Sequence, residues 1–302
     1  MKLHEITIGS ATIGGPLGSR SGLLVGSLFY DKHSVVKDPF TGDFDEQRAG
    51  ELLRTATTAA RRNGVQIAID VIAASAEAIA RFLPFVAENC PLPMMINSSE
   101  AEVHITGLEV AARHGILDRC IFASLNMDTE DDEIEALRKH RPAAVMIMAN
   151  DGSDPTPDGC CDFIESFYQP LLDDLGVEAP IVDLGTMDAP SVGLCLRGIS
   201  AVRERFGFPA GCAFSNCVSQ WTGLRGLGRE YVNYSLGAAL VACRGAGGDF
   251  LHYGLIEKTK AIAHIAGSAE VFYGFAAQEL DGEVLPDGHA LLKMFKLGES
   301  AA

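Results

Sequence analysis

The sequence predicts an α/β protein that folds as a (β/α)8 barrel, and two observations favour this architecture. Eight apolar runs, each suited to one strand, recur along about 250 residues with helical patterns between them. The first run is not followed by the GxGxxG turn of nucleotide-binding open sheets. An open, doubly wound sheet is therefore the second choice, and the count of eight units favours the closed barrel.

The eight runs are almost continuously hydrophobic and do not alternate with polar residues. This pattern is typical of strands that are buried on both faces of a parallel sheet. The predicted strands cover residues 23–30, 65–73, 93–99, 120–126, 143–150, 180–185, 211–216 and 249–255.

Several of the intervals carry clear helix signals. Residues 45–64 begin with acidic residues and end with bases and Gly64, which suits the helix dipole and a left-handed cap. Residues 75–90 offer Ser75 as N-cap, with a kink expected at Pro84. Residues 128–140 repeat the order of acids first and bases last, and residues 191–207 again end on bases and a glycine.

The two ends of the chain flank the predicted barrel. Residues 3–18 show apolar alternation, which predicts a short hairpin that plugs the bottom of the barrel. The core then spans about residues 20–275, and the tail at about 276–302 is expected to pack outside the barrel or to mediate contacts. No linker interrupts the chain, so residues 1–302 are expected to form one domain rather than two units.

Composition argues against several classes of protein. Of the 302 residues, 47% are hydrophobic, which is enough for a large core. No run of about 18 apolar residues occurs, so no membrane span is expected, and no signal peptide is recognised at the N-terminus. The formal net charge of −16 argues against binding nucleic acid or an anionic membrane through a basic surface.

Cysteine usage and motif spacing predict a cytoplasmic protein without a bound metal. The eight Cys lie mostly in apolar runs and form no CxxC pair, which fits reduced cysteines in a core. The HExxH spacing of zinc sites is also missing. The adjacent Cys160 and Cys161 leave a metal or redox site as a minor alternative.

Short polar side chains end most of the predicted strands, which is where a barrel of this kind carries its chemistry. They are Asp70, Asn97 with Ser98 and Ser99, Ser124 with Asn126, Asn150 with Asp151, Asp183, and Ser215 with Asn216. Any one of them could simply cap the helix that follows. Their recurrence at several independent strand ends favours a binding pocket.

The predicted pocket is rich in Asp and Asn and poor in Lys and Arg. Such side chains suit a neutral, planar, amide-like ligand, because a carboxylate can accept two parallel N–H bonds from an amino-pyrimidinone edge. A pterin ring presents that edge. No phosphate-cradling GxxxxGK[ST] and no local Ser–His–Asp signature occurs. His252, inside a late strand, is at least as readily a core residue as a site residue.

Several ordered motifs resemble a family of methyltransferase H subunits. They are "IGGPLGSRSGLLVGSLFYDKHSVV", "DVIAASAEAI", "INSSEAEVHITGLEVAARHGILDR" and "ASLN", and the resemblance extends from about residue 5 to about residue 275. The family includes the H subunit of tetrahydromethanopterin S-methyltransferase and bacterial methylcorrinoid:tetrahydrofolate methyltransferases. The wider group of pterin-binding barrels includes dihydropteroate synthase, so the resemblance implies a single pterin-binding domain, a dihydropteroate-synthase-like TIM barrel.

The resemblance also implies roles for residues at the strand ends. "FSNCVSQ" is similar to a motif of corrinoid iron–sulfur protein methyltransferases in which the Asn lies near N5 of the pterin, so Asn216 is expected to be catalytic. The residues expected to bind the pterin are Asp70, Asn97, Ser124, Asn126, Asp183 and Ser215. Asn97 stands where related sequences often have Asp, and Ala123 stands where they have Asn.

The function implied is transfer of a methyl group between a corrinoid protein and N5 of a tetrahydropterin, with tetrahydrofolate favoured. The corrinoid is expected on a partner protein, because "DKHSVV" at residues 31–36 lacks the Gly of the DxHxxG signature. A homodimer is the family expectation. The alternatives are a non-catalytic pterin-binding subunit of a methyltransferase complex, a dihydropteroate-synthase-like condensing enzyme, and a barrel enzyme for another heterocycle. The condensing enzyme is disfavoured because no late-strand Lys or basic loop for a pyrophosphate is evident.

Overall fold

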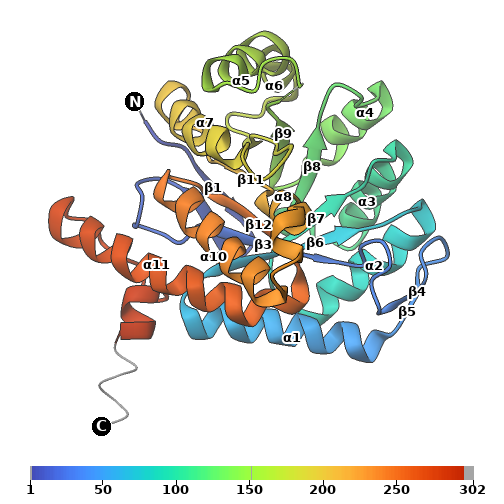
Figure 1. The fold of residues 1–302 in the computed structure, drawn as a ribbon. Coiled ribbons are helices and arrows are strands. Elements are labelled where there is room, and N and C mark those ends of the chain that lie inside the picture. The colour runs from blue at the N-terminus through green and yellow to red at the C-terminus, as the bar shows by residue number, and fades with distance from the viewer. Residues whose placement is uncertain (1, 151, 296–302) are drawn as a thin grey trace.

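A closed barrel of eight parallel strands forms the centre of the protein in the computed structural model, which describes residues 2–150 and 152–295 (Figure 1). The strands are β3 (Leu23–Leu28), β6 (Gln66–Ile72), β7 (Met94–Asn97), β8 (Cys120–Leu125), β9 (Ala144–Met148), β10 (Ile181–Asp183), β11 (Ala210–Cys212) and β12 (Phe250–Leu255). They follow one another around the ring in chain order, and β12 closes it by pairing with β3. The predicted fold class is confirmed.

Helices surround the barrel and run between successive strands. They are α1 (Glu46–Asn63), α2 (Ala76–Asn89), α3 (Ala101–Arg113), α4 (Asp131–His140), α5 (Pro157–Phe163), α6 (Gln169–Leu175), α7 (Val192–Arg205), α8 (Phe214–Gln220), α9 (Thr222–Arg225), α10 (Arg229–Gly245) and α11 (Thr259–Leu280). The π-helical turn η2 (Ile164–Tyr168) joins α5 to α6, and the short turns η1 (Leu117–Arg119), η3 (Ile256–Lys258) and η4 (Leu291–Phe295) and the small hairpin β4 (Val36–Asp38) and β5 (Asp43–Phe44) complete the elements.

The predicted helix ends are set by capping side chains and glycine. Asp45 accepts a hydrogen bond from Arg48 N at 3.0 Å at the start of α1, and Gly64 ends that helix in the left-handed conformation. Ser75 accepts from the backbone N–H three residues on, at 3.0 Å, and begins α2. The helix α2 is continuous from Ala76 to Asn89 and contains Pro84.

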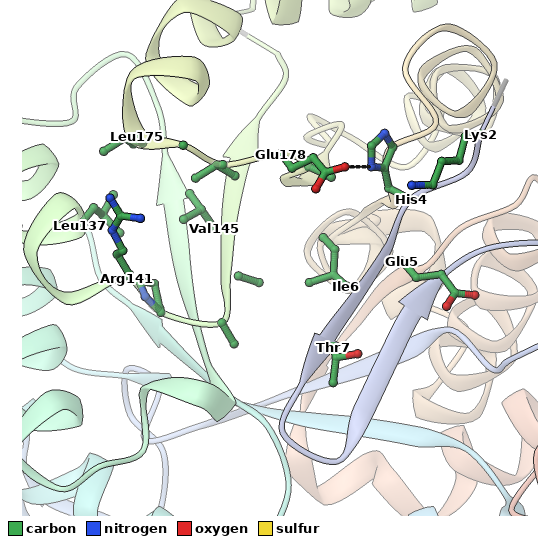
Figure 2. A pocket seen from close by; sticks show the side chains of 16 residues that line it. Lys2, His4, Glu5, Ile6, Thr7, Leu137, Arg141, Val145, Leu175 and Glu178 are labelled. Atoms are coloured by element: carbon green, nitrogen blue, oxygen red, sulfur yellow. Dashed lines mark ion pairs between the residues drawn. The ribbon is translucent and has the colours of Figure 1, made fainter.

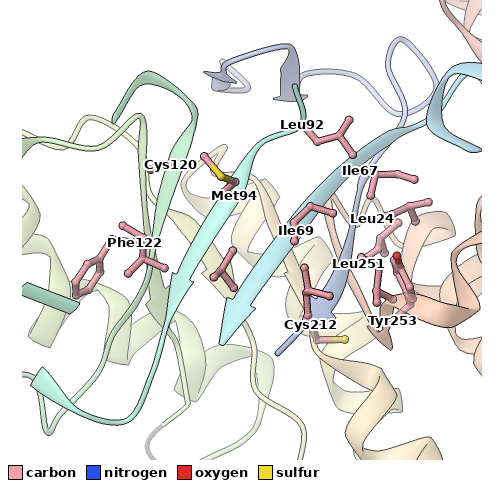
Figure 3. Packing of buried hydrophobic residues seen from close by; sticks show 14 of the residues in the cluster. Leu24, Ile67, Ile69, Leu92, Met94, Cys120, Phe122, Cys212, Leu251 and Tyr253 are labelled. Atoms are coloured by element: carbon pink, nitrogen blue, oxygen red, sulfur yellow. The ribbon is translucent and has the colours of Figure 1, made fainter. Parts of the chain in front are cut away.

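Two hydrophobic layers hold the barrel together. The outward side chains of the strands, among them Leu24, Ile69 and Phe122, are fully buried against the helices (Figure 3). The same layer contains an aromatic group in which Phe29 stacks on Phe82 with their ring centroids 4.0 Å apart. The second layer fills the barrel itself and is described below.

A hairpin closes the N-terminal end of the barrel, as the apolar alternation predicted. Its strands are β1 (Glu5–Ile8) and β2 (Ala11–Gly14), and Ile8 and Ile13 are buried in the same apolar cluster as the inner residues of the barrel strands. Gln66, at the start of β6, accepts from Thr12 N at 2.6 Å and donates to Thr12 O at 2.8 Å. This pair of hydrogen bonds fixes the hairpin against the barrel.

One predicted strand is wrong at its C-terminal end. Residues 211–216 were expected to be extended, but β11 ends at Cys212 and the helix α8 begins at Phe214. The side chains of Phe214, Cys217 and Val218 are buried, which is the i, i+3, i+4 spacing of a helix face. Ser215 and Asn216 therefore lie in the first turn of a helix and not at the end of a strand.

Candidate active site

The interior of the barrel changes from apolar to polar at the carboxyl ends of the strands. Alternate residues of a strand face the same side, so side chains two apart stack along the barrel axis. One inner layer is apolar and contains Val25, Ala68, Met95, Ile181 and Phe250. The residues two positions further along these strands are Ser27, Asp70, Asn97, Asp183 and His252. A polar layer thus closes the barrel at the end where enzymes of this architecture carry out their chemistry.

Asp70 is fully buried, and polar atoms of three side chains lie within hydrogen-bond distance of its carboxylate. Ser27 Oγ donates to Oδ2 at 2.7 Å, and His252 Nε2 lies 3.1 Å from the same oxygen. Asn97 Nδ2 donates to Oδ1 at 2.9 Å. An ionised carboxylate can accept all three of these hydrogen bonds. Asp70 therefore holds the three side chains in place from just beneath the mouth of the barrel.

Asn97 ends β7 and is only half-buried. Its Nδ2 must face the Asp70 oxygens, since an ionised carboxylate can only accept. The amide oxygen of Asn97 therefore points away from the Asp70 carboxylate. The neighbouring Ser98 serves the turn before α3: its hydroxyl donates to Ala73 O and accepts from Glu100 N, both at 3.1 Å.

His252 joins the cluster to the helix α8. Its Nδ1 lies 3.3 Å from Ser215 Oγ, while its Nε2 lies 3.1 Å from both Asp70 Oδ2 and Ser27 Oγ. A register irregularity interrupts the pairing of β12 with β3 between His252 and Gly254. Bulges of this kind re-aim side chains beside active sites. The sequence left His252 undecided and missed Ser27, although the alternation from Leu23 and Val25 places Ser27 on the inner face.

Asp183 is the last residue of β10 and is nearly buried. Its Oδ1 accepts a hydrogen bond from Gly185 N at 2.9 Å. Burial raises the pKa of the Asp183 carboxyl, and the backbone N–H of Gly185 and the charge of His252 oppose that rise. Asp183 lies two positions beyond Ile181 on β10 and so belongs to the same polar layer as Asp70.

Ser215 and Asn216 differ sharply although they are adjacent. Ser215 is buried against His252, whereas Asn216 is exposed. Within residues 2–150 and 152–295, no hydrogen bond engages the Asn216 amide. Figure 1 shows α8 near the middle of the barrel, which agrees with the contact between Ser215 and His252. Asn216 thus presents a free amide beside the polar layer.

The fourth-strand residues are engaged locally. Asn126 Oδ1 accepts from Asp128 N at 2.7 Å, and its Nδ2 donates to Ser124 O at 3.4 Å. No hydrogen bond of the described part of the chain links Ser124 or Asn126 to the Asp70 cluster. Asn150 likewise accepts from Gly152 N at 2.8 Å, and Asp151 lies outside the described residues.

A hollow lies at the opposite end of the barrel. It has a volume of about 420 Å3 and is lined by β1, the start of β9 and the segment before β10, as Figure 2 shows. His4 Nδ1 and Glu178 Oε1 face each other across it at 3.8 Å. This hollow is at the N-terminal ends of the strands, where barrels of this type carry stability rather than chemistry. The polar layer at the other end is therefore the better candidate site.

The described part of the chain contains neither a helix that could span a membrane nor a cluster of side chains that could bind a metal ion. None of the helices in residues 2–150 and 152–295 is both long and apolar enough to cross a bilayer. No group of three or more His, Cys, Asp or Glu side chains in those residues is arranged to hold a metal ion. Cys160 and Cys161, considered as a metal or redox pair, are both buried in α5.

Comparison with known proteins gives one family match. The family model described as "Tetrahydromethanopterin S-methyltransferase MtrH subunit" matches residues 2–285. The H subunit of tetrahydromethanopterin S-methyltransferase from Methanothermobacter marburgensis is 29% identical over 301 residues, which are 96% of each chain. The H subunit of the putative methyltransferase mtx from Methanosarcina barkeri is 28% identical over 286 residues, which are 91% of this chain and 92% of the relative.

Solved structures with the same fold include dihydropteroate synthases. The enzyme from Thermus thermophilus has a TM-score of 0.63 at 16% identity, covering 90% of this chain and all of its own. The enzyme from Xanthomonas albilineans, in complex with 7,8-dihydropteroate, has a TM-score of 0.59 at 13% identity, covering 91% of this chain and 99% of its own. At these identities the likeness concerns the fold alone.

Proposed function

The chain belongs to the tetrahydromethanopterin S-methyltransferase MtrH subunit family, and on this premise we propose that it is a cytoplasmic methyltransferase acting on a tetrahydropterin. It moves a methyl group between a corrinoid protein and N5 of the pterin, with tetrahydrofolate as the pterin to test first. The observation that carries this proposal is the polar layer at the barrel mouth, with the free amide of Asn216 beside it.

The polar layer supplies what the edge of a pterin ring requires. Asp183 accepts N–H bonds from the amino-pyrimidinone edge, and the outward oxygen of Asn97 accepts another. Asp70 contributes through Asn97, whose amide it orients, because its own oxygens already accept from side chains. Ser215 lines the wall beside the ring. Ser124 and Asn126 contact the ring from the β8 side, which requires Asn126 to exchange its bond with Asp128 for one with the ligand.

Asn216 is placed at N5 in this proposal. An amine is a poor leaving group, so N5 needs a hydrogen bond or a proton when the methyl group departs. A positioned amide stabilises the charge that develops at N5, and removing one such group typically slows a reaction by about 10²–10³-fold. Because no hydrogen bond within residues 2–150 and 152–295 engages the Asn216 amide, both its donor and its acceptor are available.

Exposed apolar side chains surround the mouth and support docking of a partner that carries the corrinoid. Phe40, Met127, Met187 and Trp221 are all exposed and lie on loops that follow β3, β8, β10 and β11. Large exposed apolar residues gathered on one face mark protein interaction sites. A partner that docks on this rim brings its cofactor over the polar layer.

Exposed aromatic side chains on two outer helices support a homodimer. Tyr231 and Tyr234 of α10 and Phe272 and Phe275 of α11 are exposed, on two helices that pack against each other. Aromatic side chains are enriched at the cores of protein interfaces. Light scattering of the purified protein, with Phe272→Lys as the disrupting variant, tests this association.

A second candidate function is a pterin-binding subunit that does not itself catalyse. The relatives are named as subunits of methyltransferases, so another subunit in a complex could complete the reaction. Calorimetry would then show pterin binding in a protein that transfers no methyl group.

The deciding experiment mixes the purified protein with a methylated corrinoid protein and either tetrahydrofolate or tetrahydromethanopterin. The corrinoid spectrum reports loss of the methyl group, and mass spectrometry reports the methylated pterin. Transfer to tetrahydrofolate supports the full proposal, and transfer to tetrahydromethanopterin alone corrects the pterin. Pterin binding without transfer favours the non-catalytic role, and neither binding nor transfer overturns both candidates.

A further inference from the structure

We infer that Ser215, His252 and Asp70 form a proton relay that connects the pterin site to the interior of the barrel. The relay would take the proton that N5 loses when it gains a methyl group and return it when the methyl group leaves. This inference rests on the proposed function, but its central claim about His252 can be tested without it.

The hydrogen bonds determine which nitrogen of His252 carries the proton. Ser27 donates its only hydroxyl proton to Asp70 Oδ2 at 2.7 Å, so the atoms within 3.1 Å of His252 Nε2 are two acceptors. Nε2 therefore carries a hydrogen. In the neutral ring Nδ1 is then an acceptor, and the atom facing it, 3.3 Å away, is the hydroxyl oxygen of Ser215. Ser215 therefore donates its hydroxyl proton to His252, and its oxygen can still accept a hydrogen bond.

The local backbone is built to bring these groups together. The irregularity in β12 falls between His252 and Gly254, directly at the relay. Gly254 has a φ of +81°, and a Cβ added there would stand 3.0 Å from Ser215 Oγ. A residue with a side chain at this position would push Ser215 away from the strand. The bulge and the glycine thus permit a helix residue to touch an inner-facing histidine.

The surroundings of His252 can accept its positive charge. Asp70 on β6 and Asp183 on β10 are the charged groups that face it, together with the hydroxyls of Ser27 on β3 and Ser215 on α8. The ring of Phe250, with its centroid 6.2 Å away, covers the inner side. Within the described chain, no Lys or Arg forms an ion pair with Asp70, Asp183 or His252. A protonated His252 would be the cation that balances two buried carboxylates.

The relay step balances when the methyl group moves onto the pterin. The N5 lone pair forms the new nitrogen–carbon bond, and the electron pair of the cobalt–carbon bond stays with the partner's corrinoid. N5 then bears an extra proton, which passes to Ser215 Oγ as the hydroxyl proton of Ser215 passes to His252 Nδ1. His252 becomes an imidazolium that remains hydrogen-bonded to Asp70. Transfer in the other direction reverses each of these movements.

The first test concerns the free protein and needs no activity. Nitrogen-15 NMR of the histidine rings, with the His252 signal assigned from its loss in His252→Gln, reports which ring nitrogen is protonated. The relay requires that the neutral ring carries its hydrogen on Nε2 and leaves Nδ1 as an acceptor. A neutral ring with hydrogen on Nδ1 could not accept the Ser215 proton and would overturn the inference.

The second test uses single-turnover methyl transfer. His252→Gln keeps a hydrogen-bonding side chain that cannot carry a proton, and Ser215→Ala interrupts the path with little change in size. We expect either variant to slow transfer by about 100-fold or more, a typical contribution of general acid–base catalysis. Pterin affinity should stay within about tenfold, and the double variant should be no slower than the slower single variant.

Controls separate the relay from a structural effect and from failure of the proposed function. His289→Gln changes another buried histidine, beside the N-terminal hairpin at the far end of the barrel, and should transfer at the wild-type rate. The wild-type pH–rate profile should contain an ionisation that is absent from His252→Gln. If the wild-type protein is active and His252→Gln and Ser215→Ala are equally fast, the relay alone is overturned. If the wild-type protein is inactive, the proposed function is overturned and the NMR result still stands.

Discussion

The change Asp183→Asn tests how the pocket holds its ligand. Asp183 is 6% exposed at the end of β10, and Gly185 N donates to its Oδ1 at 2.9 Å. The substitution keeps the size and one acceptor oxygen of the side chain, but it removes the charge and replaces the second oxygen by a donor. A pterin N–H facing that position would then meet another N–H.

The size of the effect follows from the bonds at stake. A hydrogen bond to a charged group contributes about 1.5–3 kcal/mol, so the loss of one weakens pterin binding by about 10- to 150-fold. Isothermal titration calorimetry with tetrahydrofolate measures this change directly. Asp118→Asn is the matched control, because it removes one exposed carboxylate at the other end of the barrel.

The same variant makes a prediction about pH. Burial raises the pKa of Asp183 in the free protein, so its carboxylate is protonated at a higher pH than an ordinary Asp. Wild-type pterin affinity should fall as the pH drops through that raised pKa, and the affinity of Asp183→Asn should not change over the same window. A raised pKa in the folded protein means that ionisation of Asp183 destabilises the folded state as the pH rises. Removing the charge should therefore cost less than about 1 kcal/mol of stability at neutral pH.

Two outcomes would refute this reasoning. Unchanged pterin affinity in Asp183→Asn, with wild-type affinity in the control, would show that the carboxylate does not hold the ring. A large loss of stability at neutral pH would show instead that Asp183 is mainly a structural anion, and the weaker binding would then carry no information about the pocket.

Three further predictions concern the reaction, the hairpin and the core. Asn216→Ala should keep pterin affinity within about tenfold and slow single-turnover methyl transfer by about 10²–10³-fold; transfer at the wild-type rate would remove Asn216 from the reaction. Gln66→Ala should lower the free energy of urea unfolding by about 2–4 kcal/mol, because it breaks both bonds to Thr12 and leaves a backbone N–H unpaired. A loss within about 0.5 kcal/mol, the usual range for a substitution at an unimportant surface site, would mean that the hairpin is held by apolar contacts alone. Phe82→Ala should cost about 3–5 kcal/mol in the same assay by opening a cavity beside Phe29, and an unchanged midpoint would contradict the packing.

The barrel could be predicted from the sequence because its signal is repeated and local. Each strand is a continuous apolar run, and each helix begins and ends with residues whose preference is chemical, such as Asp45 and Gly64 in α1. Asn97 and Asp183, which end β7 and β10, could be placed at the mouth for the same reason, and Asp70 lies just beneath it, two residues before the end of β6. A strand end in a parallel barrel has one possible location, whatever its neighbours are.

The failures occur where a local pattern has two solutions. The stretch "GCAFSN" is apolar enough for a strand, but packing of Phe214 and Val218 turns it into a helix after Cys212. The ligand-binding role of Asn126 stays a prediction, and in the free protein its Oδ1 accepts a hydrogen bond from Asp128 N. A short side chain that can bond its own backbone gives the same sequence signal as one that faces a ligand.

The sequence by itself determined the class of the fold, the family and the end of the barrel where polar groups gather, because each of these follows from periodic or ordered local patterns. Only the tertiary structure decided how the polar groups combine. It turned Asp70 into an anchor beneath the mouth, oriented the Asn97 amide, and brought His252 between Asp70 and Ser215. Asp70 lies 182 positions and Ser215 lies 37 positions from His252 in the chain. Contacts over such separations depend on closure of the barrel and on a bulge in one strand, and neither is written in any local run of residues.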